Sequence, residues 1–275
     1  MKEIAGKVAF ITGGSSGVGL GISRACMEAG MKVAIGYRTD AHVDQAMRQL
    51  AGAGSRIHPI CVDVTDREAM ANAAKEVVAV FGKVHVLVNN AGVQNPAPLS
   101  AMSYAEWDAL MSVNVGGIFN GVQAFLPHLR QHGEGGHIVA TSSIVGLFTA
   151  GARYAAYCAS KFATVAMMES LRAELAPSNI GVSVVCPGPV KSNLEAFLQN
   201  FPLASDPLDI GRLVLKGMQN NDLYILTHPE FNVVVQHRND MIMASCPPDV
   251  QPSEEKKALA KSVLERSIYF TDKHR

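Results

Sequence analysis

The sequence predicts an α/β fold in one domain, a doubly wound parallel sheet of about seven strands with helices on both faces and a C-terminal helical extension. Short apolar runs alternate with longer amphipathic stretches along the chain. The runs are rich in β-branched residues and nearly continuous in apolar character, as strands buried on both faces must be. Alternation of this kind favours parallel strands joined by right-handed helical crossovers.

Seven apolar runs are predicted as strands because each is short and bounded by polar or glycine-containing segments. In chain order they are VAFI (Val8–Ile11), KVAIGY (Lys32–Tyr37), IHPICV (Ile57–Val62), VHVLV (Val84–Val88), HIVATS (His137–Ser142), VSVVC (Val182–Cys186) and LYILT (Leu223–Thr227).

Helices are expected in the longer stretches between these runs and after the last of them. The final two follow HPE and the proline-rich CPPDVQP, which is typical of a linker. The predicted helices are Gly17–Ala29, Ala41–Ala53, Arg67–Phe81, Ala105–Gln131, Arg153–Ala176, Phe231–Ala244 and Glu254–Ile268.

Composition excludes several classes of protein. Hydrophobic residues make up 48% of the 275 and charged residues 17%, which suits one large core and not a disordered chain. Lys plus Arg and Asp plus Glu both number 24, so no charge excess points to nucleic acid or a membrane surface. The five scattered cysteines form no ligand cluster, so we expect no metal site. With no signal-peptide stretch and no run that approaches a membrane span, a cytoplasmic location is expected.

A glycine-rich segment, TGGSSGVG (Thr12–Gly19), follows the first predicted strand directly. In an open parallel sheet ligands bind beyond the carboxyl ends of the strands, where glycines let backbone N–H groups approach a pyrophosphate. Ile22 stands where a strict G-x-G-x-x-G pattern needs its third small residue, so a tight structural turn is the alternative. The strand–loop–helix context favours a nucleotide in a Rossmann-type sheet, bound by Gly13, Ser15, Ser16, Gly17, Val18 and Gly19.

The end of the second predicted strand bears on which nucleotide is bound. An acidic residue there binds the ribose of NAD, but this strand ends in GYRTD, with Tyr37 at that place. Arg38 can hold a 2′-phosphate with its planar guanidinium, joined by the Thr39 hydroxyl. The sequence therefore predicts NADP(H), with NAD(H) as the alternative if Asp40 folds back and Arg38 is an ordinary surface residue.

The segment YAAYCASK contains a tyrosine and a lysine, Tyr157 and Lys161, at a spacing that shares one helix face. A free phenol has a pKa of about 10. A fixed ammonium nearby favours the phenolate and lowers that pKa toward the range of an acid-base catalyst. Taken alone, such a pair is more often a packed tyrosine beside a solvated lysine.

Several short motifs occur in order along the chain, each at the end of a predicted strand or on a predicted helix. With these motifs the sequence resembles the short-chain dehydrogenases/reductases, from about Ile4 to Cys186 and more weakly through Asn232. They are Thr12–Gly19, Asp63–Val64, Asn89–Gly92, Asn114–Val115, Ser142–Ser143, Tyr157–Lys161 and Pro187–Gly188.

The resemblance implies an oxidoreductase that moves hydride between nicotinamide and the carbon of an alcohol or ketone. Tyr157 would exchange the proton, Lys161 would bind the nicotinamide ribose and lower the phenol pKa, and Ser143 would steady the substrate oxygen. Asn114 would bind, through its backbone, a water that leads to Lys161. Ser142 remains the alternative to Ser143, because the segment from Ser143 to Tyr157 is slightly longer than in the family.

The same resemblance implies the remaining cofactor contacts. Asp63 would bind the adenine amino group, with Val64 contributing its backbone. The small residues after the fourth strand would allow close approach, and the loop after the sixth strand would lie under the nicotinamide, with Ser192 where the family usually has threonine. These two groups are Asn90, Ala91 and Gly92, and Pro187, Gly188, Val190 and Ser192.

We expect residues 1–248 to form the catalytic domain, with a substrate lid at about 190–220, and residues 249–275 to form a helical tail. An apolar set on and beside the lid predicts a bulky hydrophobic or aromatic secondary alcohol or ketone, with helix packing as the alternative. KSN and THPE loosely resemble dehydrogenases of benzylic alcohols in lignin-type aryl ethers. By analogy the chain forms a homodimer or homotetramer. The apolar set is Leu147, Phe148, Leu194, Phe197, Leu198 and Phe201.

Two other classes remain as alternatives. A nucleotide-sensing binding protein could keep the fold without chemistry, but it has little use for Asn114, Ser143, Tyr157 and Lys161 together. A methyltransferase on a similar sheet has no use for the tyrosine–lysine pair.

Overall fold

The computed structural model describes residues 1–194, 196–247 and 249–271. Its centre is a sheet of seven parallel strands in the order β3-β2-β1-β4-β5-β6-β7. The order reverses beside β1, as in a doubly wound sheet. The strands are β1 (Val8–Thr12), β2 (Lys32–Tyr37), β3 (Ile57–Cys61), β4 (Val86–Asn89), β5 (Gly136–Thr141), β6 (Ile180–Cys186) and β7 (Tyr224–Leu226).

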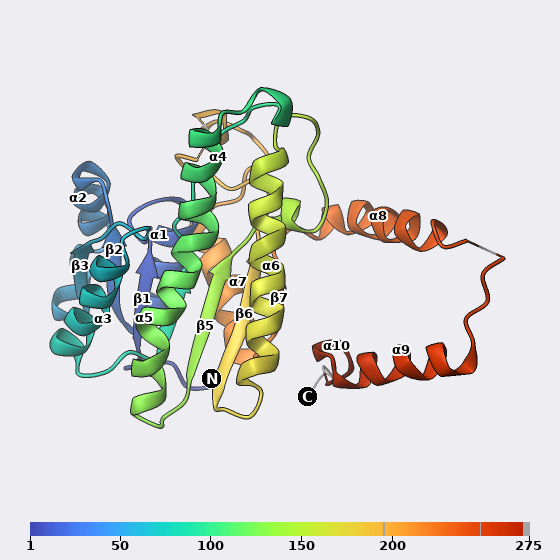
Figure 1. Cartoon of the computed structure of the whole chain (residues 1–275). Coiled ribbons are helices and arrows are strands. Elements are labelled where there is room, and N and C mark those ends of the chain that lie inside the picture. The colour runs from blue at the N-terminus through green and yellow to red at the C-terminus, as the bar shows by residue number, and fades with distance from the viewer. Residues whose placement is uncertain (195, 248, 272–275) are drawn as a thin grey trace.

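Helices cover both faces of the sheet (Figure 1), with α3, α5 and α6 on one face and α1 and α7 on the other. The helices are α1 (Gly17–Glu28), α2 (Asp40–Gln49), α3 (Arg67–Phe81), α4 (Tyr104–Met111), α5 (Gly117–Gln131), α6 (Ala155–Leu175), α7 (Pro207–Asn220), α8 (Asn232–Ala244), α9 (Glu254–Arg266) and α10 (Ile268–Thr271).

The strands are buried on both faces because their side chains alternate between two apolar clusters. In β1, Phe10 belongs to the cluster under α5 and Ile11 to the cluster under α1, and both are fully buried. The ring of Phe10 stacks on Phe125 of α5 at 4.5 Å between centroids. The α/β fold predicted from the nearly continuous apolar runs is confirmed.

The helix predicted at Ala105–Gln131 is interrupted. A π-helical turn, Ser112–Gly116, separates α4 from α5. Such turns occur mostly as single-turn bulges, frequently at functional sites. The turn contains Asn114, whose side chain is buried.

By length and composition alone, the described residues contain one helical stretch that could span a membrane, Tyr104–Gln131. This differs from the expectation that no run approaches such a length. Core helices pass the same test, and α5 buries Phe125 and Leu129 against the sheet.

The lid predicted at about 190–220 is wrong in its second half. Residues 207–220 form α7, which buries Ile210, Val214 and Met218 in the core beside α1. The two helices approach closely where a Cβ added to Gly21 would lie 1.8 Å from the carbonyl oxygen of Pro207. Residues 207–220 are therefore part of the core, and the lid stays a prediction for the residues before α7 alone.

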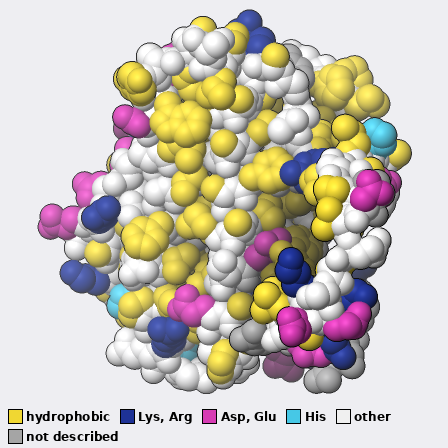
Figure 2. All heavy atoms as spheres, turned by 45° about the vertical axis from the view of Figure 1, so that its right-hand side comes forward, with side chains coloured by type: hydrophobic (Ala, Val, Ile, Leu, Met, Phe, Trp, Pro, Cys, Tyr) yellow, Lys and Arg dark blue, Asp and Glu magenta, His cyan; other side chains and the backbone are white. Residues whose placement is uncertain are grey.

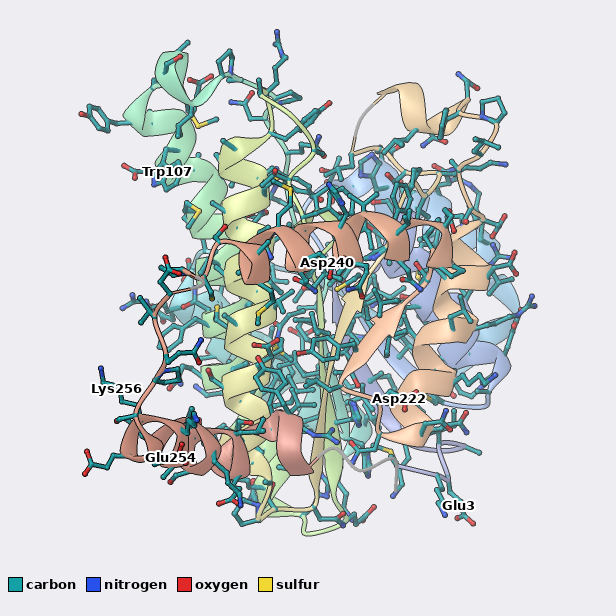
Figure 3. The ribbon with its side chains drawn as sticks, turned by 90° about the vertical axis from the view of Figure 1, so that its right-hand side faces the viewer. Glu3, Trp107, Asp222, Asp240, Glu254 and Lys256 are labelled. Carbon is teal, nitrogen blue, oxygen red and sulfur yellow. The ribbon has the colours of Figure 1, made fainter. Side chains whose placement is uncertain are left out.

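The C-terminal helices extend from the body of the molecule. Figure 3 shows α8, which carries Asp240, crossing in front of the sheet region, and α9, which carries Glu254 and Lys256, lying below it. Arg238 of α8 stacks on the ring of Phe162 in α6, and Tyr269 of α10 donates to Glu169 Oε2 at 2.8 Å. Figure 2 shows hydrophobic side chains spread over the face that is seen when the right-hand side of Figure 1 is turned forward. The structure describes a single chain, so the homodimer or homotetramer expected by analogy stays a prediction.

A cluster of histidine and acidic groups lies where the sheet begins. His85 Nδ1 accepts from the Val8 N–H at 3.2 Å, so its Nε2 donates to Glu134 at 3.0 Å. His132 donates from Nε2 to the Val84 carbonyl and accepts at Nδ1 from the Glu134 N–H. Because both rings use both nitrogens, the three side chains form a structural cluster and offer no free ring lone pair to a metal.

Two buried histidines make stability depend on pH. Burial lowers the pKa of His85 and lowers that of His137 to about 3. Below about pH 6.5, the usual histidine pKa, the unfolded chain takes up protons that the folded chain does not. The free energy of unfolding should therefore fall on acidification by up to about 1.4 kcal/mol per pH unit for each histidine.

Urea unfolding between pH 8 and pH 5 checks this expectation. His137→Gln keeps a donor toward Ser183, which lies 2.8 Å from His137 Nε2, but cannot titrate, so the slope should decrease. His237→Gln on the exposed face of α8 is the control and should leave the slope unchanged. If the free energy of unfolding changed equally with pH in the wild type and both variants, buried His137 would not be a source of the pH dependence.

Candidate active site

A cavity of about 440 Å³ lies beyond the carboxyl ends of the strands. Its walls come from the segments that follow β1 to β6, which meet at one edge because the strands are parallel. Of the predicted site residues, those that line it are Gly13, Ser15, Ser16, Gly17, Val18, Tyr37, Arg38, Thr39, Asp63, Val64, Asn90, Ala91, Gly92, Ser143, Tyr157, Lys161, Pro187, Gly188, Val190 and Ser192.

The glycine loop forms the floor between β1 and α1. Gly13 and Gly17 have φ of +63° and +48°, the left-handed region that favours glycine. Ser16, the N-cap of α1, gives the helix no side-chain cap, so the first N–H groups of α1 face the cavity region without that partner. A Cβ added to Gly19 would lie 2.2 Å from the Gly13 carbonyl oxygen. This cradle fits a pyrophosphate, which suits a helix N-terminus.

Thr12 fastens the glycine loop to the segment after β4. Its Oγ1 accepts from the N–H groups of Asn90 and Ala91 at 2.9 and 3.0 Å. Asn90 in turn donates from Nδ2 to the Thr12 carbonyl at 3.1 Å and accepts from Thr141 Oγ1 at 3.1 Å. The three strand ends are therefore held as one unit around the cavity.

Charged groups lie at the end of the cavity near β2 and β3. Two hydrogen bonds from Thr65, one from its N–H and one from its hydroxyl, hold the pKa of Asp63 below its usual range. Arg38 Nη1 lies 4.0 Å from Asp63 Oδ2, and 66% of the Arg38 side chain is exposed. The guanidinium is thus available to an anionic ligand group at this end.

Tyr157 and Lys161 lie together on α6 at the opposite end. Lys161 Nζ is 5.4 Å from the centroid of the Tyr157 ring and donates to the Thr141 carbonyl at 2.9 Å. Lys161 is 4% exposed and Tyr157 8%. Burial lowers the pKa of the Lys161 ammonium to about 8. The helix spacing therefore brings the cation beside the phenol, as the sequence predicts.

The two adjacent serines differ in how they are bound. Ser142 is 2% exposed and its hydroxyl donates to the Lys161 carbonyl at 2.8 Å, inside α6. Ser143 makes two longer contacts, donating to the Pro187 carbonyl at 3.3 Å and accepting from the Val145 N–H at 3.4 Å. A hydroxyl held by long bonds can exchange them for a ligand more readily, which favours Ser143.

Asn114 and Gly19 do not line the cavity. Asn114 binds both backbone groups of Val93, at 2.8 and 3.0 Å, and donates to Ser160 Oγ at 3.0 Å. A Cβ added to Gly92 would lie 3.4 Å from Asn114 Oδ1 and 3.6 Å from Lys161 Nζ. Asn114 therefore lies behind the wall, where it joins the loop after β4 to α6.

The prediction that the apolar set lines the substrate pocket is wrong in part. Leu194 and Leu198 line the cavity, but Phe148 instead stacks on Phe231 at 6.0 Å between ring centroids, and Leu147 packs on the core. Neither of these two nor Phe201 lines it. The side chain of Phe197 lies outside the described residues.

Several lining residues carried no recognised signal in the sequence. Those beside predicted strand ends could have been found from their position alone, whereas His42 and Asn193, which lie 3.3 Å apart at their side-chain nitrogens, come from distant segments. The residues missed are Gly36, His42, Val62, Val93, Gln94, Val113, Thr141, Asn193 and, as a lining residue in its own right, Ser142.

Comparison with known proteins identifies the family. Residues 7–201 match the family model described as short chain dehydrogenase. The C alpha-dehydrogenase of Sphingobium sp. (strain NBRC 103272 / SYK-6) is 35% identical over 272 residues, which cover 90% of this chain and 89% of the relative.

Two solved structures agree. A short-chain dehydrogenase from Novosphingobium aromaticivorans has a TM-score of 0.87 and 36% identity, with 97% of this chain and 98% of that chain covered. A short chain dehydrogenase/reductase from Burkholderia phymatum, solved in complex with NAD, has a TM-score of 0.84 and 28% identity, with 92% and 100% covered. This chain belongs to the short-chain dehydrogenase/reductase family of oxidoreductases, which bind NAD(P)(H).

Proposed function

We propose that this protein interconverts a secondary alcohol and a ketone with NADP(H), and that Tyr157 is its acid-base group. One observation carries the proposal, which is that Tyr157 and the buried Lys161 share one cavity with the glycine loop. The bound nicotinamide would supply or accept hydride. The residues of this chain would supply everything else that the reaction needs.

Each polar group has a role that its surroundings support. Tyr157 passes the proton to or from the substrate oxygen, and the Lys161 cation lowers its pKa. Ser143 donates a hydrogen bond to the same oxygen as charge develops there. Asn114 holds the loop after β4 against α6 through its side chain, which binds both backbone groups of Val93 and donates to Ser160 Oγ. The family resemblance adds the proposal that its backbone binds a water on the proton path to Lys161.

Absorbance at the reduced-nicotinamide band, followed with a panel of ketones and alcohols and with both cofactors, tests the proposal. A protein that binds the dinucleotide but turns over no member of the panel would favour the non-catalytic sensor instead.

The substrate class that we propose is a bulky hydrophobic or aromatic alcohol or ketone. Leu194, Leu198 and Val93 give the cavity an apolar portion. The relative named C alpha-dehydrogenase makes benzylic alcohols of lignin-type aryl ethers the first compounds to assay. Relatives named as hydroxysteroid dehydrogenases also favour a bulky secondary alcohol.

Arg38 supports a preference for NADP over NAD, because its guanidinium is largely exposed at the cavity end where Asp63 lies. Arg38→Leu should weaken NADP⁺ binding by roughly 10–100-fold, the loss of one or two charge-assisted hydrogen bonds, and leave NAD⁺ binding nearly unchanged. Fluorescence titration of both cofactors with both proteins measures this. Strong preference of the wild type for NAD⁺ would overturn the assignment.

A further inference from the structure

His228 lies just after β7, is 3% exposed and does not line the cavity. Its Nδ1 accepts from the Gly188 N–H at 2.9 Å and lies 2.8 Å from Thr227 Oγ1. A backbone N–H can only donate, so Nδ1 is the acceptor and the proton of the neutral ring is on Nε2. Nε2 therefore donates to Ser205 Oγ, which lies 3.0 Å away.

The two partners of this ring belong to the two ends of one segment over the cavity. Gly188 lies in the loop after β6, and Ser205 pairs with that loop through a bond from Ser205 N–H to the Pro189 carbonyl at 3.0 Å and one from Lys191 N–H to the Ser205 carbonyl at 3.1 Å. Between them runs the segment that brings Leu194 and Leu198 to the cavity. One imidazole thus ties both ends of the segment to the sheet.

The loop is shaped around the ring. A Cβ added to Gly188 would lie 2.7 Å from Cγ of His228, so a larger residue would displace the loop or the imidazole. On its other side the loop is held by the Pro187 carbonyl, which accepts from the Ile144 N–H at 2.8 Å and from Ser143 Oγ. The loop after β6 is therefore held on one side by His228 and on the other by Ser143 and Ile144, which follow β5.

We propose that His228 is a positioning residue. Through Gly188 it fixes the loop that lines the cavity near Tyr157, and through Ser205 it couples that loop to the base of the overlying segment. The inference rests on the proposed function, because the position of the loop matters to catalysis only if the nicotinamide end of the dinucleotide binds against it.

Three substitutions separate the two bonds of the ring. His228→Asn places an amide oxygen near the position of Nδ1 and can still accept from the Gly188 N–H. His228→Gln places an amide nitrogen near the position of Nε2 and can still donate to Ser205. His228→Ala removes both bonds and leaves the buried Gly188 N–H without its acceptor.

Two affinities are measured for each protein. The first is for the dinucleotide that the wild type prefers. The second is for the adenosine half of that dinucleotide, which is adenosine 2′,5′-bisphosphate for NADP⁺ and AMP for NAD⁺. His228→Ala and His228→Gln should weaken dinucleotide binding by roughly 10–100-fold and His228→Asn by much less. The adenosine half should bind all variants as it binds the wild type. Turnover should fall with dinucleotide affinity, because a displaced loop misplaces the reacting carbon.

Ser205→Ala is the matched control, since it removes only the bond at the base of the segment and should leave dinucleotide affinity closer to the wild type than His228→Gln does. Equal loss for the dinucleotide and the adenosine half would show a general structural role and overturn the proposal. So would His228→Asn binding no better than His228→Ala. A wild type that binds no nicotinamide dinucleotide would instead refute the proposed function itself.

Discussion

Replacing Tyr157 with phenylalanine should abolish measurable turnover and leave cofactor binding within about twofold of the wild type. A positioned acid-base group contributes about 10²–10⁴-fold, and the variant loses the only proton that the phenol can exchange. The ring itself is retained, so its packing with Leu110 and Ala156 should keep the fold intact. Initial rates with the best substrate of the panel and a fluorescence titration of the dinucleotide measure the two quantities separately.

Tyr154→Phe is the matched control, because Tyr154 precedes α6 by one residue and lies two helical turns before Lys161. We expect it to change turnover far less. If Tyr157→Phe retained near-wild-type turnover, or if Tyr154→Phe were the more damaging change, the acid-base assignment would have to move to another residue.

The sheet could be predicted from the sequence because its signal is local. A run such as VAFI in β1 is apolar at every position, as a strand covered on both faces must be, and it is too short for a buried helix. The motifs at the strand ends could be placed for the same reason, since parallel strands bring their carboxyl ends to one edge.

The sequence also contains a local signal for the helix α7. Asp206 caps it by accepting from the Leu208 N–H at 2.8 Å, Pro207 occupies its first turn, and Ile210, Val214 and Met218 follow at helical spacing. The lid expected at about 190–220 included this segment, although its N-cap and apolar spacing are those of a helix packed on the core.

Other features of the structure could not be predicted from short stretches of the sequence. The π-helical turn at Asn114 depends on bonds from its amide to Val93 and Ser160, which lie far apart in the sequence. The contact of Gly188 with His228 joins residues 40 positions apart. The glycine alone indicates only a turn, and the histidine alone only a buried polar side chain, so their fit appears once the fold brings them together.

Replacing Lys161 with methionine should lower turnover by roughly 10²–10⁴-fold and move the inflection of the pH–rate profile for alcohol oxidation toward about 10, the pKa of a free phenol. The cation lies 5.4 Å from the Tyr157 ring in a buried site, where its attraction for a phenolate is poorly screened. Methionine keeps an unbranched side chain, one atom shorter than that of lysine, and removes the charge. If the inflection of the variant stayed at the pH of the wild type, Lys161 would not be the group that lowers the pKa of the Tyr157 phenol.

The same substitution should not destabilise the fold at pH 7. Burial lowers the pKa of Lys161 from 10.5 to about 8, so between those values the unfolded chain binds more protons and stability rises with pH. Below pH 8 the folded protein therefore carries a desolvated cation at a cost to stability, although the bond to the Thr141 carbonyl offsets part of it. Lys161→Met should then show an equal or higher Tm at pH 7 together with its lost activity, as expected where a site residue is kept for chemistry at the expense of stability. A large drop in Tm would mean that the ammonium serves the fold, and the lost activity could no longer be assigned to proton transfer.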